Sequence, residues 1–365
     1  ACAFPLRSIM PIKVLDDRIS RRTLLKSGVA LTGMAALTVS GARPASADQP
    51  NVTVAVIGDG RSGIWASLRE EAVTRQVEKD AGARITWQPG FTASLPVMEA
   101  IRAGGVDFSF ATATAIVNAV AADVPIIPLA AYPLPSDTVD ILVAADSPIK
   151  APADLRGKRI AHQNGTTGTY SLIKYLQEGG LRLTDVEAVS LSGADAFTAL
   201  AQGSVDAWIH WQPATSLGLA RLGDKFRRLD GVKTYDYAFY VAREDFYTQH
   251  PDVAVSLVKS IRDTQARVNA DPKAAVKVWE SLGGFDSTGF EPAVYEKLIA
   301  DKRLSESLVD TVKPIDEAAA RSTQEMADSF QELGVLPAKT DVADFLLAPK
   351  FDEVKDRLQK KLGVA

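Results

Sequence analysis

Two periods of hydrophobic residues alternate along the first half of the chain. A β-branched run at 52–57 stops at a glycine turn, and the apolar positions at 64–79 then follow helical spacing. A second strand is predicted at 84–87, a helix at 94–103 and a third strand at 106–110. Strands that alternate with helices in this way predict an α/β fold with a mostly parallel sheet.

A short pattern then occurs a second time about one hundred residues later. The segment at 100–107, AIRAGGVD, is echoed by ALAQGSVD at 199–206. Each copy predicts a helix end, a glycine turn and a short strand, and each is followed by a polar or aromatic cluster, at 111–114 and at 210–213. The repeat indicates that one chain holds two similar α/β units.

Two extended stretches, at 138–144 and at 235–242, lie between and after these units. We interpret them as two crossings between lobes, which would form a hinge. Lobe one would then comprise residues 48–144 and 235–365, with mainly helical sequence after His250, and lobe two residues 145–234.

The first fifty residues indicate export. Arg21 and Arg22 precede a weakly apolar run at 28–41, and Ala45-Ser46-Ala47 has the small residues of a signal peptidase site. Residues 1–47 therefore resemble a bacterial twin-arginine signal peptide, with cleavage expected before Asp48. Cleavage leaves roughly 320 residues, enough for two domains of ordinary size.

Composition narrows the chemistry. The chain has 46% hydrophobic and 24% charged residues and a net charge of −4, which argues against a nucleic-acid surface. Its one cysteine, Cys2, lies in the segment to be removed. No metal-site spacing, catalytic triad or phosphate loop is recognisable, so we expect neither metal nor cofactor.

Several segments carry a family resemblance. ADLRGKRIA at 153–161, GTTGTYSL at 165–172 and GSVDAWIHWQPA at 203–214 resemble the taurine and alkanesulfonate periplasmic binding proteins, within the NMT1/THI5-like superfamily. The resemblance implies a two-lobed class II periplasmic binding protein with a two-strand hinge, the Venus-flytrap fold, that serves an ABC importer. The expected partners are a small organic anion, the transporter permease and its ATPase, and the expected state is a periplasmic monomer.

The family holds the anion at helix N-termini on both lobes. Carried onto this chain, that implies ligand contacts at Thr112, Ala113, Thr114, Thr166, Thr167 and Gly168. Unpaired N–H groups and the helix dipole favour an anion at such positions, although the threonines could also simply cap their helices.

Five further residues are candidates for the cleft. Arg61 and Ser62 follow the first strand, and Arg61 could pair with an anion or lie solvated at the surface. Trp211 and Tyr237 could wall the organic part of the ligand or pack in the core. Gln212 stands where relatives carry an acidic or small residue, so recognition of an amine end is left open.

The predicted function is the capture of a small organic anion, foremost a sulfonate such as taurine or an alkanesulfonate, without catalysis. Sulfate esters, nitrate and aromatic acids are alternatives within the same class. An enzyme on the same fold, similar to the thiamine-pyrimidine synthases, is the rival from another class. Such an enzyme would need reactive side chains clustered in the cleft, whereas residues 48–365 contain no cysteine and three histidines, His162, His210 and His250.

Overall fold

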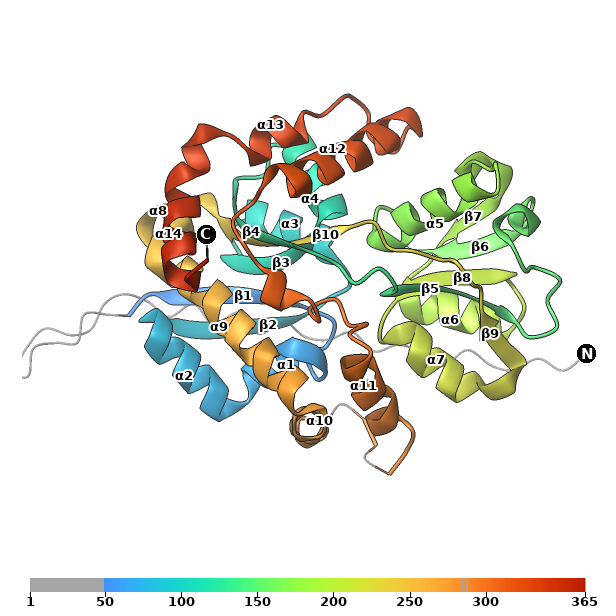
Figure 1. Cartoon of the computed structure of the whole chain (residues 1–365), viewed down its shortest axis with the longest axis horizontal. Coiled ribbons are helices and arrows are strands. Elements are labelled where there is room, and N and C mark those ends of the chain that lie inside the picture. Colours follow the sequence, from blue (N-terminus) through green and yellow to red (C-terminus); the bar gives the residue numbers. More distant parts are fainter. Residues whose placement is uncertain (1–48, 284, 287, 365) are drawn as a thin grey trace, which may run out of the picture. The chain divides into compact units, whose positions relative to one another are not determined.

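The computed structural model describes residues 49–364 except 284 and 287. The predicted signal peptide at 1–47 lies outside these residues. Two five-stranded sheets organise the described part of the chain, and both belong to one compact unit (Figure 1). None of the helices described here is long and apolar enough to cross a membrane.

The first sheet has the strand order β2-β1-β3-β10-β4. Its strands are β1 (Asn51–Ile57), β2 (Arg84–Phe91), β3 (Phe108–Thr112), β4 (Ile126–Pro133) and β10 (Tyr237–Arg243). Strands β2, β1 and β3 run parallel, whereas β10 is antiparallel to both β3 and β4.

The second sheet repeats this arrangement with the order β7-β6-β8-β5-β9. Its strands are β5 (Val139–Ala144), β6 (Arg159–His162), β7 (Glu187–Ser190), β8 (Ala207–Trp211) and β9 (Phe226–Arg228). Strands β7, β6 and β8 are parallel, and β5 is antiparallel to β8 and β9. The α/β fold is confirmed, and the two sequence echoes end at equivalent strands, β3 and β8.

Asp107 and Asp206, the last residues of the two repeated segments, make equivalent contacts in the two sheets. The Asp107 carboxylate accepts a hydrogen bond from Thr53 N on β1 at 2.8 Å, and the Asp206 carboxylate accepts one from Arg159 N on β6 at 2.8 Å. Each also pairs with an arginine, Arg243 or Arg159. These carboxylates fasten neighbouring strands together.

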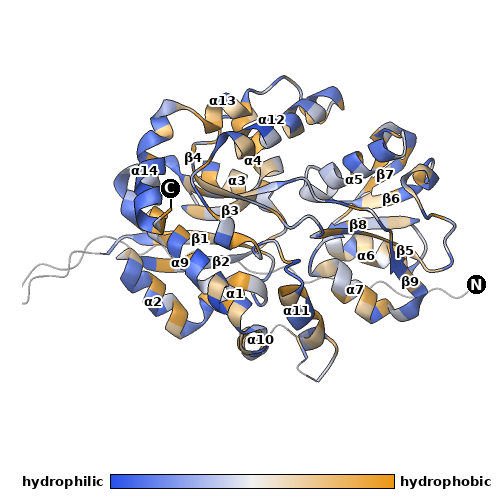
Figure 2. Cartoon of the chain, viewed as in Figure 1, coloured by the Kyte–Doolittle hydropathy of each residue, from blue (hydrophilic) through white to orange (hydrophobic). Residues whose placement is uncertain are grey.

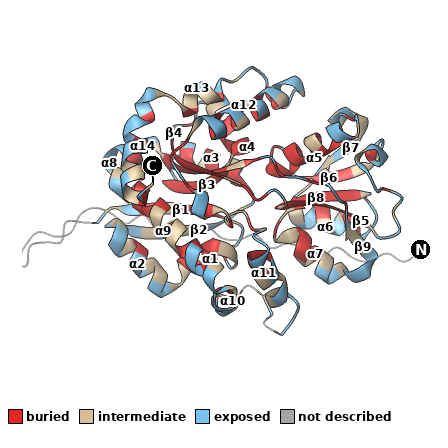
Figure 3. Cartoon of the chain, viewed as in Figure 1, coloured by how far each residue is buried: buried red, intermediate tan, exposed pale blue. Residues whose placement is uncertain are grey.

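Helices cover both faces of each sheet (Figures 1 and 2). Around the first sheet and beyond it lie α1 (Gly63–Arg69), α2 (Glu71–Ala81), α3 (Ser94–Arg102), α4 (Ala113–Ala121), α8 (Glu244–Gln249), α9 (Pro251–Ala270), α10 (Pro272–Ser281), α11 (Glu291–Ala300), α12 (Glu317–Glu332), α13 (Val342–Leu346) and α14 (Asp352–Leu362). The second sheet carries α5 (Thr167–Glu178), α6 (Gly193–Ala201) and α7 (Ala214–Leu222). Apolar residues of α1, α2 and α9 pack on one face of the first sheet, and those of α3, α4 and α12 on the other. Strands β3, β4 and β10 are almost wholly buried, whereas the edge strand β2 is not (Figure 3).

One predicted helix is divided. The apolar spacing at 64–79 predicted a single helix, but Glu70 has an extended backbone (φ −55°, ψ 131°) and separates α1 from α2. The Leu68 carbonyl, which loses a helical partner at this break, accepts a hydrogen bond from Thr74 Oγ1 at 2.7 Å. Hydrophobic spacing continued through the break because both short helices pack on the same sheet face.

The crossings between the sheets lie next to the predicted ones. Val139–Ala144 was expected to end lobe one, but as β5 it is hydrogen bonded between β8 and β9 of the second sheet. The chain therefore crosses earlier, at 134–138, and returns at 229–236 before β10. The two crossing segments are joined by Leu134 N to Asp236 O at 3.0 Å and Thr234 N to Ser136 O at 2.8 Å. We call the part built on the first sheet lobe one and the part built on the second sheet lobe two.

Candidate functional site

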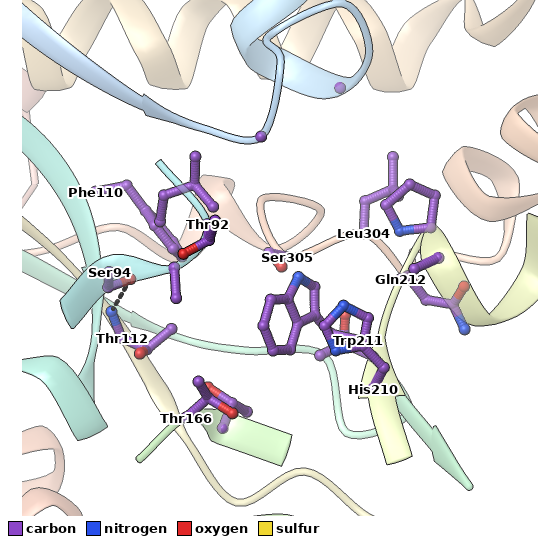
Figure 4. Close-up of a pocket in the computed structure, with 18 of the residues that line it drawn as sticks. Thr92, Ser94, Phe110, Thr112, Thr166, His210, Trp211, Gln212, Leu304 and Ser305 are labelled. Atoms are coloured by element: carbon purple, nitrogen blue, oxygen red, sulfur yellow. Dashed lines mark hydrogen bonds between the residues drawn. The ribbon is translucent and has the colours of Figure 1, made fainter. Parts of the chain in front are cut away.

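A pocket of about 630 Å³ lies where the carboxyl ends of parallel strands from both lobes meet. Open α/β sheets commonly bind ligands at this edge. Lobe one supplies the turns after β1, β2 and β3, lobe two supplies those after β6 and β8, and a segment after α11 closes the wall. Thr92, Ser94, Phe110, Thr112, Thr166, His210, Trp211, Gln212, Leu304 and Ser305 are shown in Figure 4.

The turn between β2 and α3 brings Ser94 into the pocket. Ser94 is the first residue of α3 and is 5% exposed. Its Oγ accepts a hydrogen bond from Thr112 N at 3.3 Å, the dashed line in Figure 4. No acceptor for the Ser94 hydroxyl hydrogen occurs within the described chain, so this hydrogen is available to a ligand oxygen.

The turn between β3 and α4 supplies two adjacent hydroxyls. Thr112 Oγ1 and Thr114 Oγ1 are 2.8 Å apart, and both residues line the pocket. A single hydrogen bond between two hydroxyls uses only one of their two hydrogens. One hydroxyl hydrogen of this pair therefore stays available.

The hydroxyls at the start of α5 are already engaged. Thr166 Oγ1 donates to Gln163 O at 2.6 Å, and Thr167 Oγ1 donates to Asp236 Oδ2 at 2.6 Å. The backbone N–H groups of Thr167 and Gly168 belong to the first turn of the helix, where no carbonyl lies one turn earlier to accept them. Lobe two can thus offer an anion its backbone donors rather than its threonine hydroxyls.

Asp236 joins the two lobes beside the pocket. Its carboxylate accepts hydrogen bonds from Ala113 N at 3.1 Å, Tyr237 N at 2.8 Å and Thr167 Oγ1. Burial raises the pKa of Asp236 to about 7, although these three donors oppose the shift. The N–H of Ala113 is therefore used by an internal carboxylate and is not free for a ligand.

The β8–α7 turn forms the lobe-two wall. The His210 and Trp211 rings are tilted against each other with centroids 3.8 Å apart, and His210 also stacks on Trp208. Burial lowers the pKa of His210 to about 4, so this imidazole is neutral at pH 7. The wall is an aromatic surface without positive charge.

Gln212 lines the pocket, but its side-chain amide makes its hydrogen bonds to other residues of lobe two. Its Nε2 donates to Asp140 Oδ2 at 2.6 Å, and its Oε1 accepts from Ser216 N at 3.3 Å. Asp140 also accepts hydrogen bonds from Arg228 and Arg303. Gln212 therefore positions the turn more than it offers polar atoms to the cavity.

The charges of the lining are acidic. Asp59 and Glu306 are its carboxylates, and neither lysine nor arginine occurs among the described lining residues. Burial raises the pKa of Glu306 to about 7, although hydrogen bonds from its own backbone N–H and from the Trp65 side chain oppose the shift. An anion in this pocket would be held by dipoles and neutral donors.

The structure brings seven of the eleven candidate residues to one pocket. These are Ser62, Thr112, Thr114, Thr166, Thr167, Trp211 and Gln212. Ala113, Gly168, Tyr237 and Arg61 do not line it. Arg61 is exposed, and its Nη1 donates to Gly283 O at 3.3 Å. Of the two interpretations of this arginine, the structure favours a surface residue over a partner of the anion.

Sequence reasoning overlooked two segments, Phe91–Leu95 and Leu304–Glu306. The first segment could have been found from the sequence. Thr92 and Ser94 lie between a predicted strand and a predicted helix, the same position that made the threonines at 112–114 and 166–167 candidates. The second follows the C-terminal α11 and reaches the pocket only through the tertiary fold. No local pattern distinguishes it.

Two lobes of matching strand order around a ligand-sized pocket define the class of two-lobed periplasmic binding protein folds. The alkanesulfonate-binding protein SsuA from Xanthomonas axonopodis pv. citri, solved bound to MOPS, superposes with a TM-score of 0.68 at 26% identity. The match covers 82% of this chain and 98% of that protein. The chain belongs to the NMT1/THI5-like family, whose profile matches residues 79–275.

Two sequence relatives come from Escherichia coli (strain K12). A protein assigned provisionally to the binding of aliphatic sulfonates is 25% identical over 328 residues, which is 90% of this chain and 97% of the relative. The taurine-binding periplasmic protein is 30% identical over 210 residues, 56% of this chain and 63% of the relative. The resemblance to sulfonate and taurine binders is thus confirmed as a family relationship.

The fold also occurs in an enzyme. The desulfurization enzyme DSZB superposes with a TM-score of 0.52 at 18% identity, over 85% of this chain and 99% of that one. At this identity the match concerns the fold alone.

Proposed function

We propose that this protein is the periplasmic solute-binding component of an ABC importer and that it binds a small organic sulfonate between its lobes. Its delivery to the periplasm would depend on the predicted twin-arginine signal at 1–47. Its partners would be the transporter permease and ATPase, as expected for this family of binders. Membership of the family and the relatives that bind sulfonates support the proposal.

The convergence of three helix N-termini on one pocket carries the proposal. Helices α3, α4 and α5 all begin beside the pocket, where Ser94, the α4 N-cap Thr112 and Thr167 line it. Each helix start contributes partial positive charge, and the start of α5 also has backbone N–H groups without a helical acceptor. Ser94 Oγ and the Thr112–Thr114 pair add hydroxyl donors at the same place.

A sulfonate suits such donors. It remains ionised wherever the protein is folded, so it needs no titrating partner, only N–H and O–H groups directed at its three oxygens. A carboxylate has two oxygens, whereas a sulfonate or a sulfate ester offers three, so a group of several donors suits sulfonates and sulfate esters. The absence of arginine and lysine from the described lining supports recognition by neutral groups.

The size and walls of the pocket support an organic ligand rather than an inorganic ion. A volume of about 630 Å³ lies within the ordinary range for small-molecule sites. Trp65, Phe91, Phe110, Trp211 and Leu304 supply apolar surface for a carbon skeleton. Nitrate would leave most of this volume to water.

A screen by thermal shift tests the proposal. A ligand at about 100 times its dissociation constant adds about 2.7 kcal/mol to the free energy of unfolding. Taurine, longer alkanesulfonates, aromatic sulfonates and sulfate esters should be compared with nitrate and with carboxylates of matching skeleton. Strong stabilisation by carboxylates or nitrate, with no shift for any sulfonate or sulfate ester, would contradict the proposal.

The same samples decide between binding and catalysis. Each stabilising ligand should be recovered unchanged after prolonged incubation with the protein. Chemical conversion of the ligand would instead identify an enzyme.

A further inference from the structure

Glu306 is a carboxylate on the pocket wall that the anion site does not use. It lies in the connection between α11 and α12, directly after Leu304 and Ser305, and all three residues line the pocket. The residue is partly buried. None of the ion pairs between described residues involves it.

The other carboxylates around the cleft are differently placed. Asp140 is paired with Arg228 and Arg303, at 2.9 and 2.8 Å. Asp236 receives three hydrogen bonds from protein donors. Asp59 is exposed and accepts from Arg61 N at 2.9 Å within its own turn. For Glu306 the partners within the described chain are two neutral donors, its own backbone N–H and the Trp65 side chain.

The surroundings of Glu306 keep its charge uncompensated. Burial raises the pKa values of Tyr132 and Tyr240, and the Glu306 carboxylate raises both further. The hydroxyls of these two tyrosines are buried and have no hydrogen-bond partner among the described residues. A partly desolvated carboxylate whose donors are all neutral is costly unless a positive charge binds to it.

Different parts of the pocket lining therefore favour ligand groups of opposite charge. Helix starts and hydroxyls favour an anionic group, whereas Glu306 and Asp59 make the side-chain charge of the wall negative. A ligand with only a negative charge satisfies the first and is repelled by the second. A ligand that also carries an ammonium group satisfies both, because the ammonium supplies donors and a positive charge.

We propose that Glu306 binds a protonated amine of the ligand, so that the protein selects aminosulfonates over sulfonates that lack an amine. This inference rests on the proposed function. Glu306 acts at the cationic end of the ligand, while the sulfonate is held at the helix starts. The carboxylate thus determines specificity within the class of sulfonates.

Matched ligand pairs test the inference. Dissociation constants are measured by calorimetry for 2-aminoethane-, 3-aminopropane- and 4-aminobutane-sulfonate and for ethane-, propane- and butane-sulfonate. At one or more chain lengths the wild type should bind the amine at least about tenfold more tightly than its partner, the usual scale of a charge-assisted hydrogen bond. In Glu306→Gln this ratio should fall to about one, through weaker binding of the amine.

Asp59→Asn is the matched control, because it removes the other lining carboxylate. Asp59→Asn should change the dissociation constants of both ligands in a pair by the same factor, so that their ratio is unchanged. Glu306→Asp, which keeps the charge on a shorter side chain, should keep part of the preference for the amine. If Glu306→Gln does not fold, the wild-type ratios and the Glu306→Asp ratios decide the question.

The outcomes separate the two proposals. If alkanesulfonates bind and the amine gives no advantage at any chain length, the inference is overturned and the proposed function stands. An advantage that survives intact in Glu306→Gln also overturns it. If no member of either series binds the wild type, the proposed function fails and the inference fails with it.

Discussion

Ser94 provides the sharpest test of how the anion is held. Its Oγ accepts from Thr112 N at 3.3 Å, and its own hydrogen has no acceptor in the described part of the chain. Ser94→Ala removes one oxygen from a site that is 5% exposed and leaves the helix start in place. The substitution thus deletes a ligand donor with little change of shape.

The expected loss follows from the kind of hydrogen bond. A bond to a charged group is worth roughly 1.5–3 kcal/mol, which corresponds to about tenfold to 150-fold in the dissociation constant. The Thr112 N–H also loses its acceptor, but water in the pocket can replace it. The free energy of unfolding should therefore fall by less than about 1 kcal/mol.

Calorimetry with whichever sulfonate stabilises the wild type measures this loss. Thr166→Ala should weaken binding less than Ser94→Ala, because the Thr166 hydroxyl hydrogen is donated to Gln163 O at 2.6 Å. Ser256→Ala is the control for a lost buried hydroxyl, since Ser256 is 3% exposed in α9 and does not line the pocket. Equal affinities for Ser94→Ala and the wild type would refute the assignment of Ser94 as an anion donor.

Three further predictions concern stability, hinge motion and export. Burial raises the pKa of Asp236 from 3.8 to about 7, so the folded protein holds a proton that the unfolded chain has lost. The stabilising effect of that proton is complete below pH 3.8 and disappears as the pH rises to about 7, by up to about 4 kcal/mol. Urea unfolding of Asp236→Asn should lack this pH-dependent change, and identical pH profiles for both proteins would contradict it. If the paired crossings at 134–138 and 229–236 act as a hinge, small-angle scattering should show a modest contraction on addition of a saturating sulfonate; an unchanged profile would argue for a fixed pocket. Replacement of Arg21 and Arg22 by lysine in the full precursor should leave it in the cytoplasm, and normal accumulation in the periplasm would disprove the twin-arginine route.

Local sequence was sufficient for much of the fold. The helix predicted at 94–103 corresponds to α3 to within one residue, and α9 and α10 lie in the stretch after His250 that was predicted to be mainly helical. Their apolar spacing reflects a single buried face, and proline stands at the start of α9 and α10. The two echoes likewise marked equivalent places in two sheets, because each sheet needs the same helix, turn and strand.

Local sequence could not show which strands pair when they lie far apart along the chain. Val139–Ala144 has the composition of a strand in either sheet, and only its hydrogen bonds to β8 and β9 assign it to lobe two. No local sequence pattern marks Glu306 as a pocket residue either, because only the path of the chain after α11 brings it to the pocket. Such residues become recognisable only when both lobes are assembled.

The use of a helix N-terminus depends on the side chains that compete for it. The starts of α4 and α5 have the same local form, a strand, a threonine and a helix, and both predict free donors for an anion. Asp236, more than 60 residues away from either, takes the Ala113 N–H of α4 and the Thr167 hydroxyl of α5 with one carboxylate. Because these donors belong to different lobes, the same carboxylate also holds the lobes together beside the pocket. In the proposed site, an anion would be left with the donors that Asp236 does not reach, namely Ser94, the Thr112–Thr114 pair and the backbone N–H of Thr167. Burial raises the pKa of Asp236 to about 7, and a protonated Asp236 would repel an anion in the proposed site less than its carboxylate would.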